Sequence, residues 1–127
     1  MRKTFRGLID YIATRYDRVA EIGIGHFPDV ALALSRRGLR VFATDVKEFC
    51  HNGVDVIRDD ISEPDISAYR GVQLLYALRP PPELVPYMTC LAKGLPADLI
   101  AKPLASDRVG GRLIRHKDST FCLWKFL

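Results

Sequence analysis

The sequence lacks long apolar runs, cysteine pairs and clustered histidines. Its apolar segments fall short of the roughly 18–20 residues that span a membrane. No secretory core or cleavage site follows the basic first residues, so we expect a soluble cytoplasmic protein with no membrane attachment. The cysteines Cys50, Cys90 and Cys122 are widely spaced, and neither they nor the histidines show metal-ligand spacing. We therefore expect no metal site and no disulfide framework, but three reduced, buried thiols.

The net charge of the sequence is also small. The 19 lysines and arginines outnumber the 15 acidic residues, which gives a net charge of +4. A net charge of this size attracts polyanions only weakly. RNA stays a possible partner, but the basic residues form no RNA-binding motif that would support it. The length of 127 residues, with 48% hydrophobic residues, is typical of one globular domain. We expect residues 1–127 to form a single domain.

Helix and strand patterns alternate along the first hundred residues. The expected helices cover about 4–16, 28–37 and 83–91. Thr4 suits the N-cap of the first helix, and Pro28 suits the first position of the second. The expected strands cover 18–23, 39–44, 54–57, 72–78 and 97–101, and two more, 113–115 and 120–126, form a hairpin. This order predicts an α/β Rossmann-like fold, with a mainly parallel sheet and a C-terminal antiparallel hairpin.

Two connections look too short for a full covering helix. Residues 46–53 have room for a turn or two at most, and residues 102–111 are short and glycine-rich. We therefore expect apolar surface beside the strand at 97–101 to stay uncovered. Such a surface favours a homo- or hetero-oligomeric partner.

The most informative segment joins the first expected strand to the following helix. It reads Glu21-Ile22-Gly23-Ile24-Gly25. Glycines at this point allow a tight turn and a close approach of the backbone to a ligand. The helix that follows presents unpaired N–H groups. Because parallel sheets of this class bind ligands at the carboxyl ends of their strands, we expect a ligand here, although a tight turn alone would also need the glycines.

Acidic residues stand at the ends of the next two strands. Asp45 follows the second strand, where a carboxylate accepts hydrogen bonds from ribose hydroxyls. Asp59 and Asp60 follow the third strand and are suited to an adenine amino group. The alternative for Asp45 is a cap on the next segment, and for Asp59 and Asp60 it is turn chemistry.

These segments together resemble the first three motifs of the class I S-adenosylmethionine-dependent methyltransferases. The matching residues are Glu21-x-Gly23-x-Gly25, Thr44-Asp45-Val46 and Arg58-Asp59-Asp60-Ile61. The resemblance implies S-adenosylmethionine, or a related adenosyl ligand, as cofactor. It implies that Glu21 supports the methionine end and that the backbone of Gly23, Ile24 and Gly25 approaches the cofactor. Asp45 with the adjoining Val46 would then hold the ribose, and Asp59 or Asp60 would contact adenine.

More narrowly, the chain resembles a small archaeal family of uncharacterised proteins. Members of that family share the shortened Rossmann core and the stretch Arg79-Pro-Pro-Pro-Glu-Leu84. The family has no settled activity. This closer resemblance therefore implies a fold and leaves the function open.

Three positions depart from the patterns of the larger families. Phe27 stands where methyltransferases commonly have a further glycine, and it narrows the pocket or packs beneath it. Pro28 stands where a dinucleotide-binding GxGxxG motif needs glycine, and it has no N–H for a pyrophosphate. Arg79 stands where amino-methylating enzymes often have Asn or Asp before prolines. It either clamps a carboxylate or phosphate, the cofactor's own carboxylate included, or pairs with an aspartate of the rim.

The catalytic residues stay unassigned on this basis. Glu83 is a candidate acid or base, but it also suits a helix N-terminus. The sequence favours an adenosyl-binding protein of the methyltransferase type, with an unknown acceptor. The alternatives are a non-catalytic interaction or regulatory module and an NAD- or nucleotide-binding protein.

Overall fold

The computed structural model describes residues 5–104 and 108–127, so the predicted N-cap Thr4 lies outside the described residues. Helices and strands alternate as the sequence predicts. The α-helices are α1 (Arg6–Ala13), α2 (Asp29–Arg36) and α3 (Val85–Gly94), and short 3-10 turns are η2 (Ile66–Tyr69) and η3 (Pro82–Leu84). The strands are β1 (Arg18–Ile22), β2 (Arg40–Asp45), β3 (Asp55–Arg58), β4 (Leu74–Leu78), β5 (Asp98–Lys102), β6 (Arg112–His116) and β7 (Ser119–Trp124).

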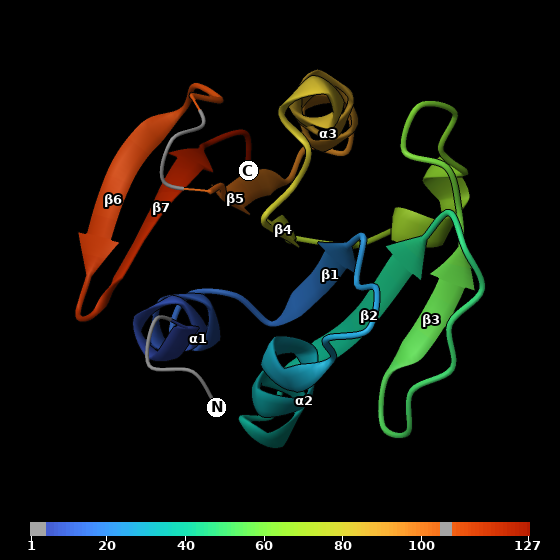
Figure 1. Cartoon of the computed structure of the whole chain (residues 1–127), viewed down its shortest axis with the longest axis horizontal. Coiled ribbons are helices and arrows are strands. Elements are labelled where there is room, and N and C mark those ends of the chain that lie inside the picture. The colour runs from blue at the N-terminus through green and yellow to red at the C-terminus, as the bar shows by residue number, and fades with distance from the viewer. Residues whose placement is uncertain (1–4, 105–107) are drawn as a thin grey trace.

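The strands form one sheet in the order β3-β2-β1-β4-β5-β7-β6. Strands β1 to β5 run parallel, whereas β7 runs antiparallel to both β5 and β6. Figure 1 shows α1 and α2 against one face of the sheet and α3 against the other. The Rossmann-like fold with an antiparallel hairpin is thus confirmed. In residues 5–104 and 108–127, no helix is long and apolar enough to cross a membrane.

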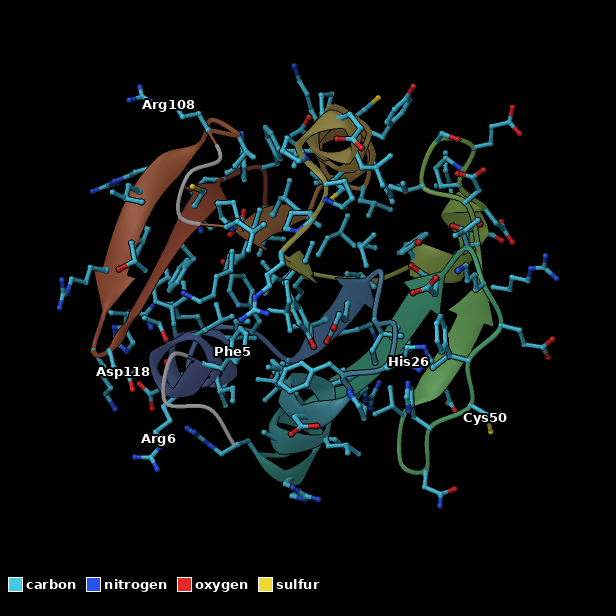
Figure 2. All side chains as sticks on the ribbon, viewed as in Figure 1. Phe5, Arg6, His26, Cys50, Arg108 and Asp118 are labelled. Atoms are coloured by element: carbon cyan, nitrogen blue, oxygen red, sulfur yellow. The ribbon has the colours of Figure 1, made fainter. Side chains whose placement is uncertain are left out.

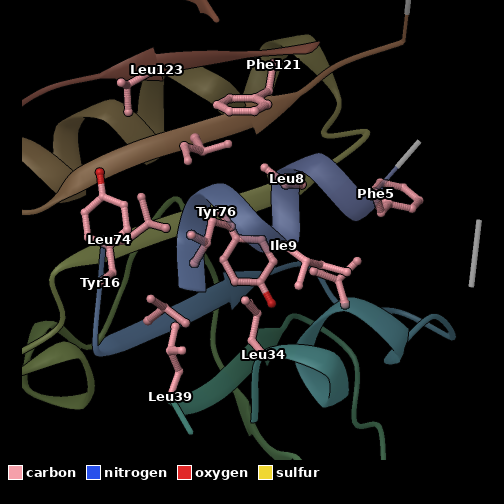
Figure 3. Packing of buried hydrophobic residues seen from close by; sticks show 14 residues of the cluster. Phe5, Leu8, Ile9, Tyr16, Leu34, Leu39, Leu74, Tyr76, Phe121 and Leu123 are labelled. Carbon is pink, nitrogen blue, oxygen red and sulfur yellow. The ribbon is translucent and has the colours of Figure 1, made fainter. Parts of the chain in front are cut away.

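Each face of the sheet has its own hydrophobic core. Leu8 and Ile12 of α1 and Leu34 of α2 pack on the face that carries Leu74 and Tyr76 of β4, as Figure 3 shows for the labelled residues. Side chains that alternate along a strand point to opposite faces. Leu75 of β4 and Leu99 of β5 therefore lie on the other face, where they pack with Met88 of α3.

Strand β5 is covered on both faces, so the prediction of uncovered apolar surface beside it is wrong. Its residues Asp98 to Ala101 are buried. The chain returns along β5 as β7, and Trp124 and Phe126 then pack against the core under α3. The aromatic side chains after the hairpin thus provide cover that a crossover helix would otherwise give. The connection at 46–53 has no helix, as predicted.

The start of α1 is capped by the hairpin and not by a neighbouring side chain. The amide of Gly7 donates to Asp118 Oδ1 at 2.8 Å, and the amide of Leu8 donates to Ser119 Oγ at 2.9 Å. Gly7 is required here because a Cβ at this position would overlap the carbonyl oxygen of His116. Further along α1, hydrogen bonds from His116 and Lys117 lower the pKa of Asp10 to about 2.

A buried carboxylate ties β5 to the residues that follow β7. Asp98 has no exposed surface and accepts hydrogen bonds from Tyr16 Oη at 2.6 Å, Lys125 Nζ at 2.7 Å and the amides of Phe126 and Leu127 at 2.9 Å. Burial alone would raise the pKa of this carboxyl, but these donors hold it below its usual range. A buried charge is tolerated here because it is fully hydrogen-bonded.

The three cysteines are free thiols, but the prediction that they are buried is wrong. Cys50 and Cys90 are exposed, and Cys122 is half-buried. Figure 2 shows Cys50 at the outer edge of the molecule, in the loop between β2 and β3. Cys90 lies on the outward side of α3. Apolar character by itself does not place a small side chain inside, because helix phase and loop position decide its exposure.

Candidate functional site

The carboxyl ends of the central strands surround a cleft. Its volume is ≈ 400 Å³, and it lies at the edge where β1, β2, β3 and β4 end. The lining residues are Ile22, Gly23, Thr44, Asp45, Val46, Asp59, Asp60, Ile61, Leu78, Arg79, Pro80, Pro81, Leu84 and Met88. Six of the nine predicted site residues are among them: Gly23, Asp45, Val46, Asp59, Asp60 and Arg79. The structure therefore brings together residues from four separate strand ends.

A smaller cavity of ≈ 190 Å³ adjoins this cleft on the α1 side of the sheet. It is lined by Phe5, Glu21, Gly23, Ile24, Phe27, Leu78 and Arg79. Gly23, Leu78 and Arg79 line both spaces, so these three residues lie between them at the ends of β1 and β4. Phe27 packs against Phe5, with ring centroids 5.5 Å apart, and forms one wall of the small cavity.

The backbone conformation of the loop between β1 and α2, the glycine loop, favours glycine. Gly23 and Gly25 have φ angles of 73° and 55°, in the left-handed region. A Cβ at either position would meet no atom within 4 Å, so the space above the loop is open. The loop is held from below by Gly23, whose amide donates to the Thr44 carbonyl at 2.8 Å. On its far side, His51 Nε2 lies 2.7 Å from the Gly25 carbonyl oxygen.

Asp45 joins the glycine loop to the end of β2. Its Oδ2 accepts the Gly25 amide at 2.9 Å, and its Oδ1 accepts the Lys47 amide at 3.1 Å. The sequence alternative of a local cap is therefore correct in part. A carboxylate oxygen has two lone pairs, however, and Asp45 also lines the cleft. The side chain thus keeps acceptor capacity toward a bound molecule.

The two aspartates after β3 have different surroundings. Asp59 accepts the Asp65 amide at 3.0 Å and the Tyr69 hydroxyl at 3.0 Å. Asp60 is exposed and accepts both the amide and the hydroxyl of Ser62 through Oδ1. These hydrogen bonds lower the pKa of Asp60. Asp59 and Asp60 therefore stabilise their own loop through local hydrogen bonds, as the predicted alternative required. Both residues also line the cleft.

Glu21 is the unusual group of the small cavity. The residue is 1% exposed, and neither its Oε1 nor the neighbouring Tyr76 hydroxyl makes a hydrogen bond of good geometry among the described residues, although the hydroxyl lies close enough to oppose the rise in the pKa of the carboxyl. Burial raises the pKa of Glu21 to about 8, so the carboxyl is mostly neutral at pH 7. A buried polar group without a partner costs free energy. Glu21 lines the small cavity, so a ligand there would lie beside this carboxyl.

Arg79 occupies the end of β4 in a strained backbone conformation. Its φ is 50°, which a residue with a side chain rarely adopts. Its amide donates to the Lys102 carbonyl at 2.8 Å, which holds the turn against β5. Within residues 5–104 and 108–127, no carboxylate lies within 4.0 Å of its guanidinium. The predicted alternative of an ion pair with a rim aspartate is therefore wrong.

The amino-acid sequence matches a known family over nearly its whole length. Residues 5–124 match the uncharacterised protein family UPF0146. The chain belongs to UPF0146. A UPF0146 protein of Archaeoglobus fulgidus is 42% identical over 118 residues, which cover 91% of each chain. This match confirms the resemblance to an archaeal family of uncharacterised proteins.

Solved structures place the UPF0146 fold among methyltransferases. The sugar N-methyltransferase KedS8 of Streptoalloteichus superposes with a TM-score of 0.61 at 13% identity, over 88% of this chain. The methyltransferase MycE of the mycinamycin pathway, solved with Mg and SAH, superposes with a TM-score of 0.52 at 13% identity, over 81% of this chain. The UPF0146 chain spans 54% of KedS8 and 31% of MycE. At these identities the likeness shows the fold.

Some residues of the cleft were not predicted from the sequence. Pro81, Leu84 and Met88 supply its apolar wall, whereas the sequence indicated the proline stretch only as a feature shared with related families and assigned it no contact with a ligand. Tyr69 fixes Asp59 from the η2 turn, and no sequence signal marks it. Glu83, in contrast, was predicted as a candidate and lines neither space.

Proposed function

We propose that this UPF0146 protein binds S-adenosylmethionine or a related adenosyl ligand across the carboxyl edge of its sheet. The observation that carries the proposal is that the two spaces lie next to each other and share Gly23, Leu78 and Arg79 as lining residues. The larger space has acidic acceptors and an apolar wall, and the smaller has a buried carboxyl. An adenosyl ligand has an apolar base, a ribose and a polar tail, which match the apolar wall, the acidic acceptors and the buried carboxyl in turn.

The described residues fit each part of such a ligand. Ile61, Leu84 and Met88 offer apolar surface to a base, and Asp60 offers a carboxylate to its amino group. Asp45 keeps lone pairs for ribose hydroxyls. The open space above Gly23 accommodates the thioether or sulfonium region. The small cavity, with Glu21 at its floor and Arg79 at its rim, takes the amino-acid tail.

Methyl transfer to an unknown acceptor is the activity that this binding site supports best. S-adenosylmethionine supplies an activated methyl group when bound. The chain itself would hold the ligand and exclude water from its tail through Phe5 and Phe27. A proton acceptor for the reaction is not evident in the lining, because Glu21 is mostly neutral at pH 7.

A non-catalytic module that binds the ligand and regulates a partner is the second candidate. It is favoured by size, because this chain spans only 54% of KedS8, and the rest of that enzyme has no counterpart in the superposition. The two candidates differ in one measurement. Binding of the ligand with methyl transfer to cellular extract supports the enzyme, and binding without transfer supports the module.

Isothermal titration calorimetry of the ligand-stripped protein tests the proposal. S-adenosylmethionine and S-adenosylhomocysteine are the test ligands, and NADH and ATP are the comparison ligands. Asp45→Ala should weaken binding of the adenosyl pair by about 1–3 kcal/mol, whereas Asp55→Ala, an exposed carboxylate on β3, should leave it unchanged. Absence of binding, or equal affinity in the Asp45→Ala protein, would overturn the proposal, and tighter binding of NADH would favour the dinucleotide alternative.

A further inference from the structure

Charge changes sign along the carboxyl edge of the sheet. Asp59 and Asp60 follow β3 and Asp45 ends β2, whereas Arg79 follows β4 and Lys102 ends β5. Because β1 lies between β2 and β4 in the sheet, the glycine loop lies between the half with the three aspartates, which also contains Arg58 at the end of β3, and the half with Arg79 and Lys102. A ligand that is neutral or polar in the acidic half therefore meets positive charge as it crosses β4.

The two basic residues lie side by side and lack carboxylate partners. Leu78 and Lys102 are paired in the parallel register, so the lysine stands beside the strand end that carries Arg79. Lys102 Nζ donates to the Thr120 carbonyl at 2.8 Å. In the part of the chain that the structure describes, neither cation has a carboxylate within 4.0 Å.

The surroundings of Lys102 contain one opposing charge, the Asp118 carboxylate, which lies more than 4.0 Å from the ammonium group. Burial lowers the pKa of Lys102; the Asp118 carboxylate opposes that change, and the positive charge of Arg79 adds to it. Asp118 is itself engaged by the Gly7 amide at 2.8 Å. Two neighbouring cations, one of them on a strained backbone, are costly unless an anion shares them.

The tail of the adenosyl ligand reaches only the nearer of these cations. Adjacent strands lie about 4.8 Å apart, so Asp45 at β2 is about 10 Å from the end of β4 and about 14 Å from the end of β5. About six bonds join the ribose to the carboxylate of S-adenosylhomocysteine, and they span roughly 7 Å when extended. A ribose at Asp45 thus allows the carboxylate to approach Arg79 but leaves Lys102 to another molecule.

We propose that Arg79 and Lys102 form an oxyanion subsite that holds the carboxylate or phosphate group of a second substrate beside the adenosyl ligand. The guanidinium of Arg79 has five N–H donors, so it contacts both the tail carboxylate and the second anion. The subsite deepens the proposed function, because it assigns the acceptor to the class of small anionic molecules. Arginine suits this task because its planar guanidinium binds carboxylate and phosphate through two parallel hydrogen bonds. Both residues act here by binding, and neither is assigned a part in chemistry.

Amide NMR titrations of the whole protein with inorganic phosphate and with acetate test the subsite. Saturable shifts at the amides of Arg79 and Lys102 are expected in the wild type. Arg79→Gln and Lys102→Gln should each weaken phosphate binding about tenfold, as expected for the loss of one charge-assisted hydrogen bond. Lys93→Gln, which removes an exposed cation from α3, should leave it unchanged.

Three results would overturn the subsite. They are shifts that do not saturate with either anion, equal weakening in Lys93→Gln, and a loss of S-adenosylhomocysteine affinity in Lys102→Gln. The last result would mean that the adenosyl ligand itself occupies both cations. Saturable phosphate binding in a protein that binds no adenosyl ligand would refute the proposed function and support the oxyanion subsite.

Discussion

Replacement of Glu21 by glutamine is expected to remove a pH dependence from the stability of this protein. Glu21 is 1% exposed, and burial raises its pKa from 4.5 to about 8. Because the folded-state pKa lies above that of the unfolded chain, folding favours the protonated carboxyl. Its contribution is complete below about pH 4.5 and is lost as the pH rises to about 8. The amide of Glu21→Gln has no such titration.

The size of the effect follows from the linkage between pKa and stability. Each pH unit inside this window costs up to about 1.4 kcal/mol. Between pH 6 and pH 8 the wild type should therefore lose about 2 kcal/mol relative to Glu21→Gln. That loss is large against the roughly 5–15 kcal/mol by which most domains are stable.

Urea unfolding followed by circular dichroism at pH 6, 7 and 8 measures this difference. All groups that the two proteins share cancel when their free energies of unfolding are subtracted. An unpaired amide at position 21 shifts the whole curve but does not change its slope. Glu83→Gln, which removes an exposed carboxylate, is the matched control and should run parallel to the wild type. Parallel curves for Glu21→Gln as well would refute a neutral buried Glu21.

Three further substitutions test the packing. Asp98→Ala should destabilise the fold by about 3–5 kcal/mol, because it leaves the buried Tyr16 hydroxyl and the amides of Phe126 and Leu127 without their acceptor. Thermal unfolding would show the loss, and a loss below about 1 kcal/mol would contradict this. Gly7→Ala should cost about 1–3 kcal/mol from the overlap with the His116 carbonyl, whereas Gly94→Ala, with open space around it, is the control for urea unfolding. Asp10→Asn should lower stability by about 1 kcal/mol at neutral pH. Since the pKa of Asp10 is lowered to about 2, an acid titration should show this advantage of the wild type disappearing as the pH falls from about 4 to 2.

The elements and their order could be predicted because each rests on a local pattern. Buried strands such as 74–78 are uninterrupted apolar runs, and Gly23 and Asp45 mark the ends of two neighbouring strands. The right-handed crossover of parallel strands then places those ends on one edge. The glycine loop and the acidic rim were predicted from the same rule.

The remaining features depend on contacts between distant residues, which a single sequence does not display. Trp124 covers the β5 region only because β7 returns beside β5. The isolation of Arg79 depends on where three aspartates direct their oxygens. Asp59 and Asp60 accept amides of their own loop, and Asp45 accepts the amide of Gly25 in the glycine loop. The exposure of Cys90 depends on the phase of α3, which begins after a 3-10 turn that the sequence did not reveal.

The joint between α1 and the hairpin sets an order of events during synthesis. Gly7 and Asp118, which bond to each other, are 111 positions apart in the sequence. During translation, α1 is made long before the hairpin. Until the hairpin exists, the amides of Gly7 and Leu8 lack their acceptors Asp118 and Ser119. The parallel strands can begin to associate in that interval, but α1 gains its cap only when β6 and β7 have formed. Folding from the N-terminus forward, the usual course during translation, is therefore completed late in this chain.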